Sequence, residues 1–174
     1  PEPGGREPAA TARQGQFVRD RLTPTAGSGS QGGRAEARWH DHFVLHDCAM
    51  AILRDGDTVL MCHRHPDREW VPNVWDFPGG HVEDHETPQQ ALARELEEEL
   101  GVTIDAPSRP ADEVLSFEDE SVRLSVWFID YGGPIENRCP EEHDDVRWVS
   151  LDVATELHLA DAEYVPLLQR ALRT

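Results

Sequence analysis

The chain has 174 residues and a formal net charge of −18 at pH 7, and no stretch approaches the roughly 18 consecutive apolar residues of a membrane span. Residues 1–42 contain six arginines and five acidic residues, so nearly all of the negative charge lies in the remainder of the chain. A body of this charge repels nucleic acids and anionic lipids, and we therefore expect neither as a partner. It also repels small phosphate compounds unless cations lie between the two.

The cysteines indicate a reducing compartment. Cys48, Cys62 and Cys139 are odd in number and show no Cys-x-x-Cys spacing, which favours free thiols. Because no signal peptide is recognisable either, we expect a cytoplasmic protein.

Composition divides the chain in two. Residues 1–41 are rich in Pro, Gly, Ser and Ala and offer little to bury, which predicts a flexible N-terminal tail. Residues 42–174 carry the apolar patterns of a folded domain.

The predicted elements alternate between strands and helices in that domain. The turn dipeptide Asp55-Gly56 predicts a hairpin, because it separates two apolar runs. Strands are expected over 43–53, 58–64, 113–119, 122–131 and 145–151, and helices over 88–100 and 161–173. This order predicts the α/β class with a mixed β-sheet.

The helix over 88–100 has clear start and stop signals. Thr87 and Gln90 form a Thr-x-x-Gln capping box, and Pro88 suits the first helical position. Gly101 is a typical stop. Leucines four residues apart then form the apolar stripe that should pack on the sheet: Leu92, Leu96 and Leu100.

An acidic cluster lies beside this stripe. Glu95 is a helical neighbour of both Glu98 and Glu99, and like charges at that spacing destabilise a helix by roughly 0.2–0.5 kcal/mol per pair. Two interpretations compete: a solvated acidic face, or a carboxylate site for Mg²⁺ or Mn²⁺. Arg94 is close enough in sequence to hold one of the carboxylates.

The wider pattern decides between these two interpretations. Residues 80–102 resemble the Nudix box, G-x5-E-x7-R-E-U-x-E-E-x-G-U, where U is a bulky apolar residue. Seven positions demand one residue type, and chance agreement is on the order of 10⁻⁷ per starting point. The preceding WDFPGG also resembles the approach to the box. The matching residues are Gly80, Glu86, Arg94, Glu95, Leu96, Glu98, Glu99, Gly101 and Val102.

The resemblance implies the Nudix fold, an α/β/α sandwich with a mixed β-sheet, over residues 42–174. It also implies Mg²⁺-dependent hydrolysis of a nucleoside diphosphate linked to another group, by attack of water on phosphorus, with Mn²⁺ as a substitute ion. The metal ligands would be Glu95, Glu98, Glu99 and the backbone carbonyl of Gly79 or Gly80, of which we favour Gly80. Glu95, Glu98 and Arg94 would be the catalytic residues, with Arg94 orienting a glutamate and Glu86 bracing the loop and helix.

Outside the box the resemblance implies further site residues. Glu142 falls where MutT-type members place an additional metal-binding or base carboxylate, and Glu141 and Asp144 are alternatives. The substrate-binding candidates are Arg64, Phe77 and Asp161. Arg64 fits a strand-end charge equally well, and aromatic residues on strands, such as Phe77 and Trp127, are more often part of a core.

A zinc site is a weaker alternative. The pairs His40/His42 and His63/His65, together with His46, lack the Cys or His partners that complete a structural zinc site.

Substrate choice follows by elimination. ADP-ribose hydrolases typically have a proline roughly fifteen residues beyond the box, and dinucleoside-polyphosphate hydrolases a tyrosine nearby. That stretch reads EVLSFEDESVRL here, with neither residue, and the coenzyme A and NADH motifs are also missing. We therefore favour a MutT-like nucleoside triphosphate pyrophosphohydrolase that releases a nucleoside monophosphate and pyrophosphate, with oxidised purine nucleotides among its candidate substrates. The alternatives are a hydrolase of nucleotide sugars, ADP-ribose or dinucleoside polyphosphates, and a catalytically silent nucleotide-binding regulatory module. The family also makes a homodimer an open expectation.

Overall fold

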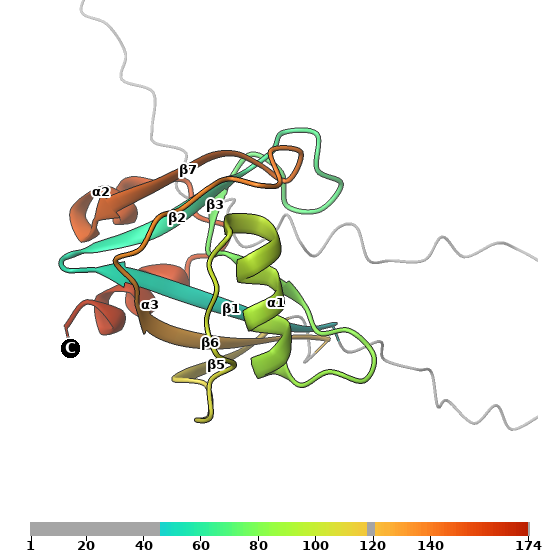
Figure 1. Cartoon of the computed structure of the whole chain (residues 1–174). Helices are drawn as coiled ribbons and strands as arrows, with labels where there is room; N and C mark the ends of the chain where they lie inside the picture. Colours follow the sequence, from blue (N-terminus) through green and yellow to red (C-terminus); the bar gives the residue numbers. More distant parts are fainter. Residues whose placement is uncertain (1–45, 118–120, 174) are drawn as a thin grey trace, which may run out of the picture. The chain divides into compact units, whose positions relative to one another are not determined.

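The structure, a computed structural model, describes residues 46–117 and 121–173. The predicted tail, residues 1–41, lies outside these residues, as do His40 and His42, so the predicted boundary of the domain stays a prediction. Ten elements follow one another (Figure 1): β1 His46–Asp55, β2 Thr58–Arg64, β3 Trp75–Asp76, β4 Gly79–His81, α1 Pro88–Leu100, β5 Glu113–Phe117, β6 Val122–Asp130, β7 His143–Ser150, α2 Leu151–Glu156 and α3 Tyr164–Ala171.

The strands form one mixed sheet with β1 at its centre. Its order is β3-β2-β1-β6-β5, and β4 and β7 pair with β1 and β2 respectively. β1 runs parallel to β6, whereas its pairings with β2 and β4 are antiparallel. At the hairpin Asp55 pairs with Thr58, and Gly56 adopts a φ of 60°, a left-handed conformation that glycine adopts without strain. The predicted hairpin and mixed sheet are confirmed, and so is the pairing of the two predicted strands over the residues that the structure describes, Glu113–Phe117 and Val122–Asp130.

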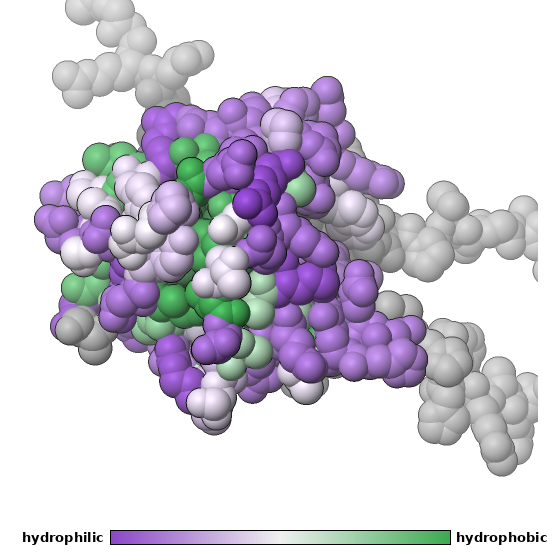
Figure 2. All heavy atoms as spheres, in the orientation of Figure 1, coloured by the Kyte–Doolittle hydropathy of each residue, from purple (hydrophilic) through white to green (hydrophobic). Residues whose placement is uncertain are grey.

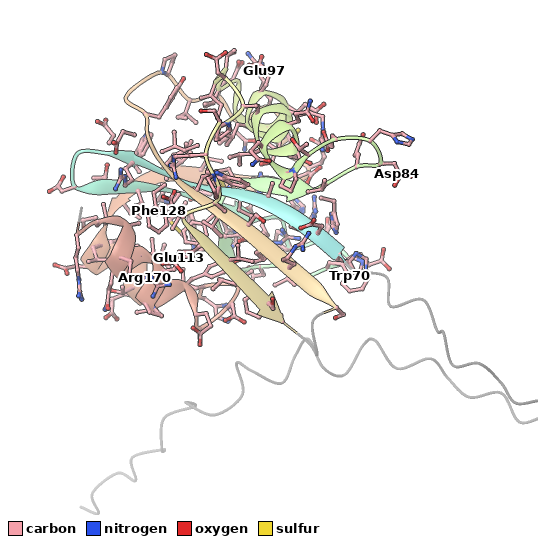
Figure 3. The ribbon with its side chains drawn as sticks, turned by 90° about the horizontal axis from the view of Figure 1, so that it is seen from below. Trp70, Asp84, Glu97, Glu113, Phe128 and Arg170 are labelled. Carbon is pink, nitrogen blue, oxygen red and sulfur yellow. The ribbon has the colours of Figure 1, made fainter. Side chains whose placement is uncertain are left out.

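Alternating side chains of β1 enter two separate cores. Met50 and Ile52 face the core that α2 and α3 cover, whereas Ala49, Ala51 and Leu53 face the core beneath α1. Helices thus lie on both sides of β1 and β6, which gives the predicted α/β/α sandwich (Figure 1). An ion pair of 2.6 Å between Arg170 of α3 and Glu113 of β5 links one helix to the sheet edge (Figure 3).

The ends of α1 match the prediction from sequence. Thr87 Oγ1 accepts a hydrogen bond of 3.3 Å from the backbone N–H of Gln90, and the Gln90 side chain accepts one of 2.9 Å from the N–H of Thr87. Gly101 ends the helix at a φ of 64° and donates its N–H to the carbonyl of Glu97. The three stripe leucines Leu92, Leu96 and Leu100 are fully buried. This fixes the rotation of α1, and hence the direction of its acidic side chains.

Thr87→Ala is expected to lower the free energy of unfolding by about 1 kcal/mol, because the N–H of Gln90 loses its side-chain acceptor. Urea unfolding measures this loss. Thr87→Ser keeps the hydroxyl and should retain most of the stability, so an equal loss in both variants would contradict the capping role.

Across the described ranges, no helix is long and apolar enough to cross a membrane.

Candidate active site

A glycine turn brings backbone close to the acidic side chains of α1. Gly79 and Gly80 form β4, which pairs with Met50 and Ala49 of β1. A Cβ added at Gly79, where φ is 136°, would overlap the carbonyl oxygen of Ala49 and lie 2.8 Å from Cα of Met50. A Cβ added at Gly80 would overlap the carboxylate of Glu95. The two glycines therefore let the turn approach β1 on one side and the carboxylate of Glu95 on the other more closely than a residue with a side chain could.

Arg94 holds three glutamates of the box in one network. Its guanidinium donates to Glu86 at 2.7 Å, to Glu95 at 2.9 Å and to Glu98 at 3.1 Å. It also donates to the backbone carbonyl of His81 at 3.0 Å, which ties α1 to the end of β4. The hydrogen bond from Arg94 holds the pKa of Glu86 below its usual value. The predicted orienting role of Arg94 and the bracing role of Glu86 fit this geometry.

Glu99 is buried beneath the other glutamates. Its side chain accepts a hydrogen bond of 3.1 Å from the N–H of Gly79, and the residue is only 4% exposed. Burial, together with the nearby charges of Glu95, Glu142 and Asp76, raises its pKa from 4.5 to about 8, although the hydrogen bond from Gly79 acts in the opposite direction. Burial also raises the pKa of Glu95, an effect that Arg94 partly offsets. A buried carboxylate is costly to ionise unless a cation accompanies it, so this pair suits a metal ion.

Glu142 reaches the same region from the start of β7. Its carboxylate forms an ion pair with Arg68, and its negative charge acts on both Glu95 and Glu99. The alternative Asp144 instead forms a 2.5 Å ion pair with His63. This placement supports Glu142 over Asp144 as the additional carboxylate.

Three of the candidate metal ligands form ion pairs with arginines. Within residues 46–117 and 121–173, no group of three or more His, Cys, Asp or Glu side chains is already arranged to hold a metal ion. Glu95 and Glu98 share Arg94, and Glu142 pairs with Arg68. The donor set nevertheless fits Mg²⁺, because it consists of carboxylates and a backbone carbonyl, the oxygen ligands that this ion prefers.

The three predicted substrate-binding residues, Phe77, Arg64 and Asp161, lie in different environments. The prediction that Phe77 stacks on a base is wrong for this structure, since the ring is 1% exposed and stacks on Tyr164 at 4.6 Å between centroids. Arg64 donates to the carbonyls of Val71 at 3.0 Å and Trp70 at 2.9 Å, and so braces the loop after β2. Asp161 accepts a hydrogen bond of 2.8 Å from the N–H of Glu163 just before α3. The roles of Arg64 and Asp161 in substrate binding stay predictions.

Sequence reasoning did not single out two charged residues of this region, Arg68 and Asp76. Asp76 is 6% exposed and accepts a hydrogen bond of 3.3 Å from Arg64. Its place directly before Phe77 in WDFPGG was the available signal. Arg68 had no local signal, because its partner lies 74 positions later in the chain.

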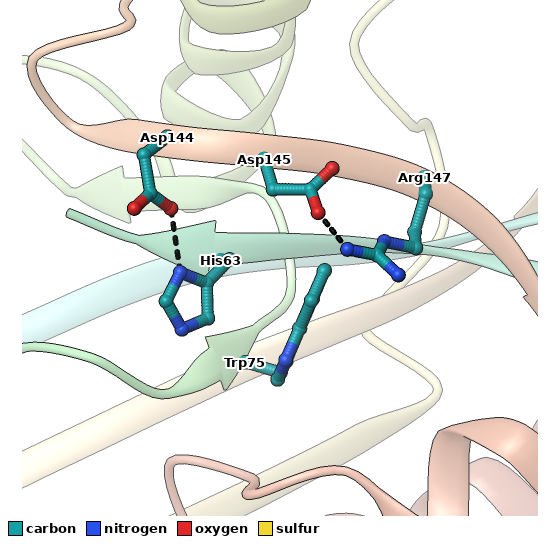
Figure 4. A pocket seen from close by; sticks show the side chains of 5 residues that line it. All are labelled: His63, Trp75, Asp144, Asp145 and Arg147. Carbon is teal, nitrogen blue, oxygen red and sulfur yellow. Dashed lines mark hydrogen bonds and ion pairs between the residues drawn. The ribbon is translucent and has the colours of Figure 1, made fainter.

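A separate pocket of about 390 Å³ lies on another face (Figure 4). In the pairing of β2 with β7, His63 lies opposite Asp145 and Met61 opposite Arg147, on the sheet face away from α1. The charged residues that line the pocket pair with one another, His63 with Asp144 and Arg147 with Asp145. The guanidinium of Arg147 also lies 4.6 Å from the centre of the Trp75 ring. The pocket is therefore distinct from the acidic face of α1. Figure 2 shows hydrophilic surface on one side of that helix and more hydrophobic surface along the other.

Comparison with known proteins agrees with this geometry. The family model of the NUDIX domain matches residues 44–170. The chain is 33% identical to the CTP pyrophosphohydrolase of Escherichia coli (strain K12) over 122 residues, which cover 70% of this chain and 86% of that protein. It is 35% identical to the 8-oxo-dGTP diphosphatase of Proteus vulgaris over 89 residues, 51% of this chain and 79% of that protein.

A solved structure shows the same fold. The MutT protein from Methanosarcina mazei Go1 superposes with a TM-score of 0.62 at 26% identity, and the match covers 74% of this chain and 94% of that chain. Together with the family match over most of the chain and the Nudix box on α1, this shows that the chain belongs to the Nudix hydrolase family.

Proposed function

We propose that this Nudix hydrolase is a Mg²⁺-dependent, MutT-like nucleoside triphosphate pyrophosphohydrolase that uses water to form a nucleoside monophosphate and pyrophosphate. The observation that carries the proposal is the close approach of the glycine turn to the acidic face of α1, where Gly80 lies against the Glu95 carboxylate and the buried Glu99 accepts a hydrogen bond from Gly79. The two relatives named for hydrolysis of CTP and of 8-oxo-dGTP support a triphosphate substrate.

The residues divide the work as follows. Glu95, Glu98, Glu99, Glu142 and the carbonyl of Gly80 would hold Mg²⁺, or Mn²⁺ in its place. When bound, the ion neutralises phosphate charge and lowers the pKa of a bound water. Arg94 keeps Glu95 and Glu98 in position through its hydrogen bonds of 2.9 and 3.1 Å. Glu95 is the candidate to accept the proton of the attacking water, because burial already raises the pKa of its carboxyl.

A product screen tests this function. The wild-type protein is incubated with Mg²⁺ or Mn²⁺ and with nucleoside triphosphates, 8-oxo-dGTP, ADP-ribose, nucleotide sugars and dinucleoside polyphosphates. The expected result is release of pyrophosphate from a triphosphate, abolished by a chelator. Turnover of a diphosphate conjugate alone would contradict the MutT-like assignment. Nucleotide binding without turnover of any compound would favour the regulatory module.

Metal binding can also be tested without turnover. Below pH 4.5 Glu99 is protonated in the folded and unfolded states alike. As pH rises towards 8, the unfolded chain ionises while the folded protein keeps the proton, so the free energy of unfolding falls by about a few kcal/mol. We expect the Tm of the metal-free protein to fall between about pH 5 and about pH 8.5, and Mg²⁺ to restore it at high pH.

Glu99→Gln is the control for this experiment. The neutral amide should remove that part of the pH dependence, because it cannot ionise, and should weaken the stabilisation by Mg²⁺. An unchanged Mg²⁺-induced shift in Tm would contradict a role for Glu99 as ligand.

A further inference from the structure

The loop of residues 65–74, between β2 and β3, is held in one conformation beside the acidic face. Two hydrogen bonds tie its C-terminal end to Arg64, where the chain enters the loop: the N–H of Arg64 donates to the carbonyl of Val74 at 2.8 Å, and the N–H of Asn73 donates to the carbonyl of Arg64 at 3.1 Å. Val71 and Asn73 have φ values of 46° and 59°. A β-branched residue rarely adopts a positive φ, so these contacts hold the loop against a local backbone cost.

This loop places Arg68 opposite Glu142. The N–H of His65 donates to the carbonyl of Glu142 at 2.8 Å, and the Arg68 guanidinium pairs with the Glu142 carboxylate. Burial is the main cause that lowers the pKa of His81 at the end of β4 and of His143 in β7, and the positive charge of Arg68 is a smaller cause of both shifts. The loop thus brings a partly exposed guanidinium to Glu142, one of the candidate metal ligands.

The two arginines nearest the ligands differ in how they are engaged. Arg94 serves three glutamates and a carbonyl, so its donors are committed within the protein. In the described part of the chain, the Arg68 side chain has Glu142 as its hydrogen-bond partner, and it is 30% exposed. A guanidinium has five N–H donors, and arginine suits phosphate oxygens because it can bind them in pairs. Arg68 is thus equipped to bind a second anion.

We propose that Arg68 changes partner during the reaction: it pairs with Glu142 in the metal-free protein and binds a polyphosphate oxygen of the substrate once Glu142 turns to the metal. This inference rests on the proposed function. It resolves a conflict of charge, because a carboxylate cannot serve Arg68 and a cation fully at the same time. Glu142 is then paired with a cation at every stage, first with Arg68 and later with the metal, and the bound phosphate oxygen is paired with Arg68. Such pairing matters in a protein whose net charge is −18.

The first arm of the test needs no substrate. Arg68→Ala, Arg68→Lys and wild type are titrated with Mn²⁺, with binding followed by calorimetry. Removal of the competing guanidinium should tighten Mn²⁺ binding by about three- to tenfold, since the pair is partly exposed and its strength correspondingly modest. Arg170→Ala is the matched control, because Arg170 forms a similarly exposed ion pair with Glu113 on the opposite side of the sheet (Figure 3).

The second arm measures turnover at saturating Mg²⁺. For Arg68→Ala we expect KM for the triphosphate to rise about tenfold or more, with kcat within about threefold of wild type, and Arg68→Lys to recover part of the loss. The proposal requires both tighter Mn²⁺ binding and a raised KM, so an unchanged value in either arm overturns it. A fall in kcat with KM unchanged also overturns it. If the wild type hydrolyses no nucleotide, the proposed function fails instead, and the Mn²⁺ arm still judges the competition for Glu142.

Discussion

Glu98→Gln is expected to lower kcat for nucleotide hydrolysis by roughly 10²–10³-fold and to leave Tm almost unchanged. The amide keeps the shape of the side chain but loses the charge that binds Mg²⁺. The Glu98 side chain is 58% exposed and bonds to Arg94 at 3.1 Å, so the fold does not depend on it. Steady-state kinetics and a thermal unfolding curve measure the two effects.

Glu97→Gln is the matched control for Glu98→Gln. Glu97 (labelled in Figure 3) is the preceding residue of α1, but its side chain pairs with Arg138 at 3.0 Å and with the hydroxyl of Thr103, and not with Arg94. It should therefore retain nearly full activity. Equal losses in the two variants would show that the general charge of the helix, rather than the particular carboxylate, supports catalysis.

Gly79→Ala is expected to destabilise the protein by about 3–5 kcal/mol, enough to prevent accumulation of folded protein at 37 °C. The added methyl group would overlap the backbone of Ala49 in the central strand, and a φ of 136° is strained for alanine. Backbone of a buried strand cannot move aside as a side chain can. Urea unfolding, or soluble yield at several temperatures, measures the loss.

Gly80→Ala provides the contrast, because its methyl group would overlap only the flexible end of Glu95 among the nearest atoms. We expect it to fold, with a loss of about 1 kcal/mol, and to lose activity through displacement of Glu95. A Gly79→Ala variant as stable as wild type would contradict the close contact of the turn with β1. A fully active Gly80→Ala variant would contradict its close contact with Glu95 of α1.

The parts of the site that sequence predicted are local. The capping box at Thr87, the stop at Gly101 and the leucine stripe are set by neighbours in one helix, and they orient Glu95 and Glu99 without information from elsewhere. The hairpin at Asp55-Gly56 depends on two turn residues. The resemblance to the Nudix box also predicted the glycine turn, because the box specifies Gly80 at a fixed distance before the helix.

The parts that sequence could not predict depend on distant pairing. Phe77 follows a strand of two residues, so no alternating pattern shows which core its ring enters, and its contact with Tyr164 joins segments far apart in the chain. The pair of Arg68 and Glu142 likewise arises from the pairing of β2 with β7. Arg64 could not be assigned to the substrate or to the loop from its position at a strand end alone.

The two alanines of β1 beneath α1 give the protein a means of adjustment that alters no charged group. Ala49 and Ala51 are fully buried, and they belong to the same core cluster as the leucine stripe of α1. The thickness of this layer sets the gap between the turn and the carboxylates. A larger side chain at either position would lift α1 from the sheet and carry Glu95 and Glu99 away from the glycine turn, without any change in a charged group.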